Sequence, residues 1–504
     1  MPILNDLVAS GAQLPGHRRW PRSTVDASTW EQALTALASG DLTLLGLWGE
    51  TAEVHMALLE EPSGAVAILT LPCPQGTYPS VGRAHPPALR LDRAIHDLFG
   101  LLPEGVPDAR PWLDHGLWPV GFPLNPARPA TAERQPYAFL ASQGEGLHQI
   151  AVGPVHAGII EPGHFRFTAN GEAVVRLEER LGYTHKGIES LMSGADLERA
   201  AKLAGRVSGD STVAYAWAFA MAVESATRSE IPKRAIWLRA LMAELERIAN
   251  HLGDVGAICN DAAFPLLLAH FGALRERTLR ASDLAFGHRL MRDCIVPGGV
   301  AVEPNAEGLA AIAGLAAEIG RQLPRLVETY ENTASLQDRT VSTGVLQSAL
   351  AAQYGAGGYV GRASGRSFDA RLALTYSPYD ELAFEMQVRE EGDVDARVWV
   401  RIREIEQSLS LVRQLLDGLP DGPSRVPLAG GGPAVEGMGI VEGFRGDVLV
   451  WLRLDAEGKI DRCHLRDPSW FQWPLLEAVV EGNIVADFPL CNKSFNCSYS
   501  GHDL

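Results

Sequence analysis

The order of hydrophobic and polar positions predicts that the chain opens with a small unit of mixed helices and strands. Residues 28–39 have helical periodicity and end before Gly40, and residues 88–99 have it again before Gly100. A glycine in this position commonly ends a helix in the left-handed conformation. Between the two helices, alternating patterns predict strands at 42–48, 53–59 and 65–71. The pattern therefore indicates an α+β unit.

Proline-rich sequence from Pro119 to Pro136 separates this unit from the rest of the chain and is typical of a linker. Beyond it, residues 164–169 alternate, Asn170-Gly171 is typical of a type I′ turn, and residues 173–177 return, which together predict a β-hairpin. The predicted organisation is a first domain at 1–120, a linker at 121–149 and a second domain at 150–504.

A helical core follows the hairpin in the predicted second domain. Its clearest helix begins at Pro232 and carries apolar side chains at helical spacing as far as Leu252, which predicts that it is buried in a bundle. Further helices are predicted at 196–225, 264–291, 307–333 and 395–416. Strand patterns return at 440–444, 448–454 and 459–465, before a short helix at 474–481 and an extended tail.

The net charge of the chain limits the classes of partner that it can bind. The formal net charge of −17 argues against nucleic acid, because phosphate binding needs clustered Lys and Arg, and it favours a basic partner surface. The longest charge-free stretch, 340–361, contains Gln347 and Gln353 and is too polar to span a membrane. The opening residues show no secretory leader pattern. We therefore expect a cytoplasmic protein whose contact with a membrane is indirect, through partner subunits.

The cysteines do not have the spacing of a metal site. None lies in the C-x-x-C pattern that zinc and iron–sulfur sites use. The six are Cys73, Cys259, Cys294, Cys463, Cys491 and Cys497. We expect buried, inert thiols and no metal or cluster bound by this chain.

Several short motifs carry a resemblance to known proteins. In the N-terminal unit they are Tyr78-Pro-Ser-Val81 and the stretch 97–110. In the second domain the motifs occur in the same order as in one family pattern. They are Gly153-Pro-Val-His156, Glu161-Pro-Gly-His-Phe-Arg166, Gly182-Tyr-Thr-His-Lys-Gly-Ile-Glu189, Gly205-Arg-Val207, Arg275-Glu-Arg277, Pro297-Gly-Gly-Val300, Arg339-Thr340, Arg362-Ala-Ser-Gly365 and Gly482-Asn-Ile-Val-Ala-Asp487. Along its whole length the chain resembles the fused 30-kDa-like and 49-kDa-like subunit of complex I. It resembles still more the large subunit of group 4 [NiFe] hydrogenases of the formate-hydrogenlyase type.

This resemblance implies an α+β fold, with a small N-terminal 30-kDa-like α/β domain followed by a hydrogenase large-subunit-like helical bundle with peripheral β-hairpins. It also identifies the positions of the nickel ligands, which the family supplies from two C-x-x-C pairs. Here Ser208 and Ser211 stand at the first pair, Ser498 and Gly501 stand at the second, and Cys497 is one residue out of register. Because soft metals of this kind need thiolates, we expect no nickel–iron centre. The chain thus resembles the energy-converting-hydrogenase-related complexes that lack nickel ligands.

The resemblance to the quinone site of complex I is also incomplete. The tyrosine that meets the quinone headgroup there is matched here by Gly209. His156 and His164 match the loop that borders the quinone cavity, and their alternative role is that of hydrogen-bonded loop histidines. A hard-metal site is a further alternative, although a remnant cavity lined by hydrogen bonds is favoured over it. Its ligands would be Asp210, Ser208, Ser211, His502 and Asp503.

The segment 182–189 supplies the strongest candidates for retained chemistry. It contains Tyr183, His185, Lys186 and Glu189, and the spacing of His185 and Glu189 predicts that they share one helix face. The resemblance places Glu189 on the proton path of the hydrogenases, and a structural ion pair at the subunit interface is the alternative. A second charged group flanks the buried helix and is expected to form interface ion pairs: Glu244, Arg247 and His251.

Three functions remain open for a chain with this resemblance. The first is an oxidoreductase subunit of the NADH:quinone oxidoreductase or hydrogenase kind, which couples electron transfer to ion translocation, with a quinone or an unknown acceptor and a degenerate centre of its own. The second is an active [NiFe] hydrogenase, and the third is an inert scaffold. The resemblance implies a small iron–sulfur subunit, a ferredoxin-like Fe–S subunit and membrane-arm subunits as partners, with the clusters in those partners. It also implies a peripheral place on the cytoplasmic side of the inner (plasma) membrane.

Overall fold

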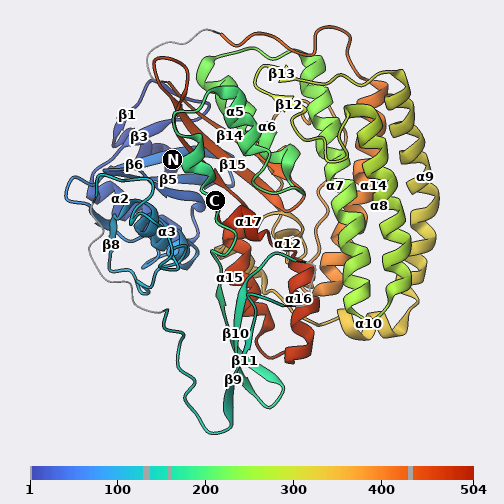
Figure 1. The fold of residues 1–504 in the computed structure, drawn as a ribbon, viewed down its shortest axis with the longest axis horizontal. Coiled ribbons are helices and arrows are strands. Elements are labelled where there is room, and N and C mark those ends of the chain that lie inside the picture. The colour runs from blue at the N-terminus through green and yellow to red at the C-terminus, as the bar shows by residue number, and fades with distance from the viewer. Residues whose placement is uncertain (1–2, 129–136, 157–159, 430–434) are drawn as a thin grey trace.

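The fold is described from a computed structural model, which covers residues 3–128, 137–156, 160–429 and 435–504. An N-terminal α/β unit lies on one side, a bundle of long helices on the other, and a C-terminal sheet between them (Figure 1). A β-hairpin projects from the middle of the molecule. The predicted α+β class is therefore confirmed. In the described ranges, none of the helices is both long and apolar enough to cross a membrane.

The N-terminal unit is built on a five-stranded sheet with the strand order β1-β3-β6-β5-β4. The predicted helices are confirmed as α2 (Ala27–Ser39) and α3 (Leu89–Phe99), which end at Gly40 and Gly100 in the left-handed conformation. The predicted strands are confirmed as β4 (Thr43–Gly49), β5 (Glu53–Glu60) and β6 (Ala65–Pro72). The sequence analysis did not predict α1 (Ile3–Ala9), β1 (Ala12–Gln13), β3 (Arg22–Thr24), β7 (Thr77–Pro79) and β8 (Leu102–Glu104).

Three antiparallel strands form the projecting sheet: β9 (Leu147–Val152), β10 (His164–Asn170) and β11 (Ala173–Arg180). The predicted hairpin is confirmed, but its turn is not type I′. Asn170 pairs with Ala173, so the turn residues are Gly171 and Glu172, and only Gly171 has a positive φ. A type I′ turn needs a positive φ at both. The part of the predicted linker at 129–136 lies outside the described residues.

Four long helices form the bundle: α7 (Lys233–Asp261), α8 (Pro265–Phe286), α9 (Ala306–Glu331) and α14 (Val394–Asp417). These predicted helices are confirmed, and α8 ends five residues early because Gly287 adopts the left-handed conformation. The prediction of one helix over 196–225 is wrong. The chain forms α5 (Leu197–Ala204) and α6 (Thr212–Thr227), with a loop at 205–211 between them. Short elements missed by the pattern are β12 (Ile295–Val296), β13 (Gly299–Val300), α10 (Ala334–Thr340), α11 (Ser348–Gln353), α12 (Gly358–Arg362) and α13 (Ala370–Ala373).

The C-terminal sheet has the strand order β16-β15-β14-β2. Its strands are β14 (Val435–Gly443), β15 (Gly446–Leu454), β16 (Ile460–Arg466) and β2 (His17–Arg18). The helix predicted at 474–481 begins earlier, as α15 (Ser469–Val480). The prediction of an extended tail is wrong, because the chain folds there into the buried helices α16 (Phe488–Phe495) and α17 (Tyr499–His502).

The N-terminal unit and the C-terminal sheet share a core. Trp48 and Ile68 from the first pack with Ile440 and Trp451 from the second in one buried cluster. Arg22 is buried and its guanidinium binds the Glu436 carboxylate across the same boundary. Strands of the unit are thus buried on both faces, which explains their continuous hydrophobic runs. The domain boundaries stay a prediction.

Small residues allow α6 to lie directly on β14. Gly437 and Gly439 face the backbone of α6, and a Cβ at Gly439 would collide with the carbonyl oxygen of Ala218 and lie 3.0 Å from the nitrogen of Ala222. The two elements therefore approach closely, and the start of α6 is held over the end of this sheet.

We expect Gly439→Ala to lower the free energy of unfolding by about 1–3 kcal/mol, because the added methyl forces α6 away from the sheet. Gly320→Ala is the matched control, since Gly320 is exposed on α9 and has no neighbour within 4 Å of the new methyl. That change should stabilise the helix by about 0.5–1 kcal/mol. Thermal melting of both variants checks this, and equal melting temperatures would contradict the packing argument.

Candidate functional site

The loop between α5 and α6 carries Ser208, Asp210 and Ser211. Lys186 holds it from outside, because its Nζ donates to the carbonyl oxygen of Val207 at 2.7 Å. The first amides of α6 have no cap from their own segment. Instead, Glu246 on α7 accepts from the nitrogens of Val213 at 2.8 Å and Ala214 at 3.2 Å. The loop is therefore fixed at both ends.

The C-terminal segment brings Ser498 and Gly501 to the same loop. Ser498 caps α17, because its Oγ accepts from the nitrogen of Gly501 at 2.9 Å. The same Oγ lies 3.4 Å from the Oγ of Ser208, although the two residues are 290 positions apart. The four predicted ligand positions therefore come together in the fold.

Arg445 occupies the centre of this group. It projects from the turn between β14 and β15 and is buried. Its guanidinium donates to Asp210 Oδ2 at 2.5 Å and Oδ1 at 3.0 Å, to Ser211 Oγ at 3.1 Å, and to the carbonyl oxygen of Asn496. Burial alone would raise the pKa of Asp210, but Arg445 outweighs it and brings this pKa to about 2. Asp210 is therefore an ionised carboxylate in a tight pair.

These residues do not fit a nickel–iron centre. Three of the four positions offer hydroxyls, which are hard donors, and the fourth offers no side chain. A Cβ at Gly501 would collide with Asp467 Oδ2, so the space of the fourth ligand holds a carboxylate. A buried guanidinium stands among them.

The residues predicted for a hard-metal site are engaged in other contacts. Asp210 is engaged by Arg445, and Asp503 accepts from the nitrogens of Gly182 and Thr184 at 2.9 and 3.0 Å. His502 stacks on Trp470 at 3.9 Å between ring centroids. The carboxylates of the predicted set thus serve hydrogen bonds and ion pairs, and the remnant cavity stays a prediction.

The prediction of buried cysteines is confirmed for all six. Burial raises the pKa of the Cys497 thiol well above its usual value. This residue, one position out of register with the family's ligand, packs in the core with Tyr499 and Trp473. It is therefore a neutral core side chain.

Tyr183, His185 and Lys186 lie in the loop 182–187, which Asp503 ties to the C-terminal segment. His185 Nδ1 lies 3.1 Å from the carbonyl oxygen of Asp503, and burial lowers the pKa of His185. Burial also lowers the pKa of Lys186 and raises that of Tyr183. Of these three residues, Lys186 contacts the segment that leads into the Ser208 loop, because its Nζ donates to the carbonyl oxygens of Arg206 and Val207.

The prediction that His185 and Glu189 share one helix face is wrong. The helix α4 (Ile188–Met192) begins after His185, because Gly187 adopts the left-handed conformation. Glu189 is buried and binds Arg462 Nη2 at 2.7 Å and His464 Nδ1 at 2.8 Å. Burial would raise its pKa, but Arg462 and His464 outweigh burial and bring it to about 2. The ion pair is within the chain, while the proton-path role stays a prediction.

The two histidines that were predicted to border a quinone cavity, His164 and His156, differ in burial and in position. His164 is buried at the start of β10, and its Nδ1 lies 2.9 Å from the carbonyl oxygen of Gly153. This is the hydrogen-bonded role that the sequence analysis gave as an alternative. His156 is half-buried in the loop that follows β9, next to the residues 157–159 that are not described.

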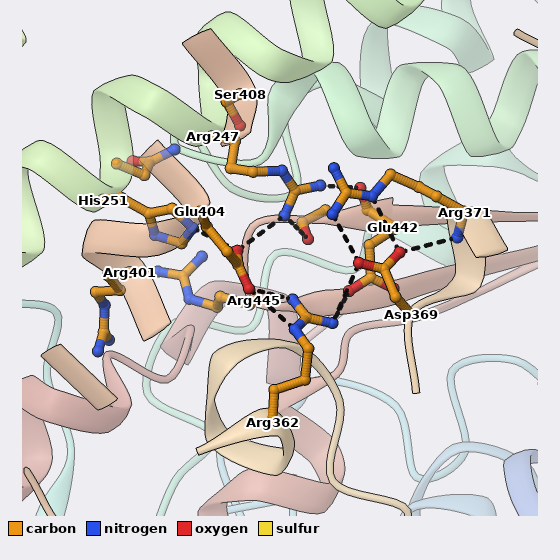
Figure 2. A network of polar contacts seen from close by, with 12 residues as sticks. Arg247, His251, Arg362, Asp369, Arg371, Arg401, Glu404, Ser408, Glu442 and Arg445 are labelled. Carbon is orange, nitrogen blue, oxygen red and sulfur yellow. Dashed lines mark hydrogen bonds and ion pairs between the residues drawn. The ribbon is translucent and has the colours of Figure 1, made fainter. Parts of the chain in front are cut away.

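Glu244, Arg247 and His251 are not at a subunit interface, which corrects the prediction. Their side chains point into the interior, where α7 meets α14 and β14, and each is at most 1% exposed. Figure 2 shows Arg247 and His251 among carboxylates and guanidinium groups from four segments of the chain. The apolar stripe of α7 predicted a buried helix, but charged residues share its inner face.

Sequence reasoning missed three residues that form the site: Arg445, Asp467 and Glu246. Arg445 follows Phe444 in a glycine-flanked turn, and Asp467 follows a strand. No spacing pattern connects either to the Ser208 loop. Glu246 lies on the predicted helix, and a carboxylate inside an apolar stripe was its only signal.

Sequence models of three families match the chain. The 30 Kd subunit of respiratory-chain NADH dehydrogenase matches residues 24–134, nickel-dependent hydrogenase matches 186–253, and the 49 Kd subunit of respiratory-chain NADH dehydrogenase matches 262–430. The three matches follow the order in which the motifs occur.

Curated relatives agree. Formate hydrogenlyase subunit 5 of Escherichia coli is 30% identical over 84% of this chain and 77% of that protein. One of the NADH-quinone oxidoreductase subunits of Dehalococcoides mccartyi is 32% identical over 67% of this chain and 92% of its own length. A chain of the membrane-bound sulfane sulfur reductase, an archaeal respiratory membrane complex, superposes with a TM-score of 0.68 at 27% identity, over 72% of this chain and all of that one.

We expect Glu189→Gln to lower the free energy of unfolding by about 3–5 kcal/mol, because Arg462 keeps its charge in a buried site without an ionised partner. Since the pKa of Glu189 lies below its ordinary value of 4.5, its contribution is present above pH 4.5 and is lost as the pH falls through about 2. The loss should therefore be constant between pH 5 and 8 in thermal melting.

The matched control is Glu198→Gln, which removes an exposed pair with Lys202 on α5 and should cost about 0–0.5 kcal/mol. If Glu189→Gln instead leaves the melting temperature unchanged and abolishes coupled turnover of the assembled complex, the proton-path role is supported and the structural role is wrong.

Proposed function

Because the chain belongs to the family of large subunits that complex I shares with membrane-bound hydrogenases, we propose that it couples electron transfer to ion translocation without a nickel–iron centre. Its relatives are subunits of membrane-bound complexes of the complex I and hydrogenase kind. In this proposal the chain is the large subunit of such a complex. It sits peripherally on the cytoplasmic side and does not enter the membrane.

The observation that carries the proposal is the Arg445–Asp210 pair at the family's nickel position. A fixed, ionised pair replaces the soft ligands, and Asp467 fills the space of the fourth thiolate. Electrons must then reach an acceptor that the chain does not hold through thiolates. We assign the iron–sulfur clusters to a small subunit and a ferredoxin-like subunit, and the ion path to membrane-arm subunits.

The chain's own contribution is to shape the cavity and to hold charge near it. Burial raises the pKa of Glu246 to about 8, with Asp210 as an adjacent negative charge, and in this proposal Glu246 exchanges a proton near neutral pH. Its carboxyl group spans the first turn of α6, next to the loop that carries Asp210. A proton held there can respond to charge arriving in the cavity. The acceptor in this proposal is a quinone or another small oxidant.

The two alternative functions, an active hydrogenase and an inert scaffold, require different residues in this chain. An active hydrogenase needs four thiolates at positions where this chain has Ser208, Ser211, Ser498 and Gly501. An inert scaffold also has a use for Glu246, because its carboxyl group caps the first amides of α6. The retained segment with Tyr183, His185, Lys186 and Glu189 is what favours the coupling role over the scaffold.

We expect the purified protein to contain far less than one nickel per chain, because hydroxyls do not replace bridging thiolates. Elemental analysis, with a nickel-dependent hydrogenase large subunit purified in parallel as the positive control, checks this. One nickel per chain would overturn the proposal.

We also expect the tagged chain to capture an iron–sulfur subunit and membrane subunits from its own cells. Leu191 is 45% exposed on α4, which follows directly on the loop 182–187, and Leu191→Glu should reduce capture about tenfold, which corresponds to about 1.4 kcal/mol. Leu284→Glu, at 49% exposure on α8 away from that loop, is the matched control. Equal capture by both variants places the interface elsewhere, and no capture by the unaltered chain contradicts the proposed complex.

A further inference from the structure

Eight side chains form a buried charge cluster between α7, α12, α13, α14 and β14 (Figure 2). Each is at most 4% exposed. We define the cluster as Glu244, Arg247, His251, Arg362, Asp369, Arg371, Glu404 and Glu442. Ion pairs connect all eight, and the residues come from segments up to 198 positions apart in the sequence.

The cluster holds more negative than positive groups. Its four carboxylates face three guanidinium groups, so with every carboxylate ionised and His251 neutral it carries one net negative charge. An uncompensated charge in a dry interior is strongly unfavourable, and a group in this situation binds a proton instead. One proton is therefore expected within the cluster, on His251 or on a carboxylate.

His251 is the poorer position for that proton. Its Nε2 lies 2.8 Å from Glu404 Oε2, while no described residue gives its Nδ1 a hydrogen-bond partner. The ring contacts Tyr359 and Phe444 edge to face. A second N–H on this ring would put charge against apolar surroundings, and burial accordingly lowers the pKa of His251.

Three of the carboxylates have ample compensation. Glu404 binds Arg362 at 2.7 Å, Arg247 at 3.5 Å and His251. Glu244 binds Arg371 at 3.0 Å and Arg247 at 3.4 Å, and Asp369 binds Arg371 at 2.6 Å and Arg362 at 3.5 Å. Each thus has at least two cationic groups or a bidentate guanidinium. These three are the ionised members.

Glu442 has the least compensation. Its Oε1 accepts from Arg362 Nη1 at 2.9 Å, a nitrogen that also faces Asp369, and its Oε2 accepts from the backbone nitrogen of Ala370 at 3.0 Å. Burial and then the charge of Asp369 raise the pKa of Glu442 to about 7. The charged and titratable groups around it are Arg362, Asp369, Arg247, Asp447 and Tyr376.

We propose that Glu442, beside Asp369, is a proton-binding site that keeps the cluster neutral and exchanges one proton with the medium near neutral pH. The step is simple protonation: the carboxylate gains a proton and the cluster loses its net charge. No electron or further reactant is involved. The inference does not rest on the proposed function, because it concerns the charge balance of this chain alone.

The position of this proton connects it to the ion pair between Arg445 and Asp210. Glu442 lies three residues before Arg445 at the end of β14, and Arg247 donates to the carbonyl oxygens of Glu442 at 2.9 Å and Gly443 at 3.1 Å. The cluster thus holds the turn that presents Arg445 to Asp210. A change of charge at Glu442 acts on the same turn.

The sign of the pH dependence follows from the raised pKa. Between pH 4.5 and about 7, folded Glu442 keeps a proton that the unfolded chain has released, so its contribution to stability falls as the pH rises. A glutamine mimics the protonated acid. The melting temperature of Glu442→Gln relative to the unaltered chain should therefore rise between pH 5 and pH 8.

Glu189→Gln is the matched control, because Glu189 is buried outside the cluster, and Arg462 and His464 outweigh burial and hold its pKa at about 2. Its melting temperature should be lower than that of the unaltered chain by the same amount at pH 5 and pH 8. If Glu442→Gln behaves like Glu189→Gln, with an equal loss at both pH values, Glu442 is ionised and the proposal is overturned.

Infrared spectroscopy of the full chain gives a second measurement. At pH 6 the unaltered chain should show a protonated-carboxyl band that shifts in D2O, and part of this band should be missing in Glu442→Gln but present in Glu189→Gln. Absence of any such band in the unaltered chain overturns the proposal even if a variant fails to fold. Both measurements are made on the isolated chain, so the nickel and capture experiments fail or succeed separately.

Discussion

The ion pair between Arg445 and Asp210 is the contact on which the centre of this molecule depends. It joins the loop before α6, the turn between β14 and β15, and, through the carbonyl oxygen of Asn496, the C-terminal segment. A buried charge without a partner costs several kcal/mol, so these segments must be placed together or not at all. The family's metal would join two of the same segments by covalent bonds, and here electrostatics connects them.

Packing places the two members of that pair within reach. Because Gly437 and Gly439 let α6 lie close to β14, the first turn of α6 comes to the end of the sheet where the β14–β15 turn begins. The shared core of the N-terminal unit and the C-terminal sheet then fixes that sheet from its other face. The site is therefore positioned by backbone packing and completed by charge.

The sequence predicted the long elements well, because helical and alternating periodicity report burial directly. The predictions from sequence were wrong where contacts between distant segments determine the local structure. One case is the break between α5 and α6, which depends on Glu246 from another helix, and the other is the folded C-terminal segment. The four ligand positions were found through resemblance. Arg445 and Asp467 were not, since an arginine in a turn and an aspartate after a strand have no distinctive pattern until the chain is folded.

The contact between Gly501 and Asp467 has an evolutionary consequence. A cysteine at 501 would collide with the Asp467 carboxylate, which also accepts a hydrogen bond from Tyr215 at 2.7 Å. A thiolate at 208 or 211 would stand beside Asp210, whose negative charge repels it. Single steps toward thiolates at 208, 211 and 501 therefore lower stability before any metal can bind. Selection that acts on one substitution at a time is therefore unfavourable to the return of these thiolates, because the present packing opposes each of the substitutions.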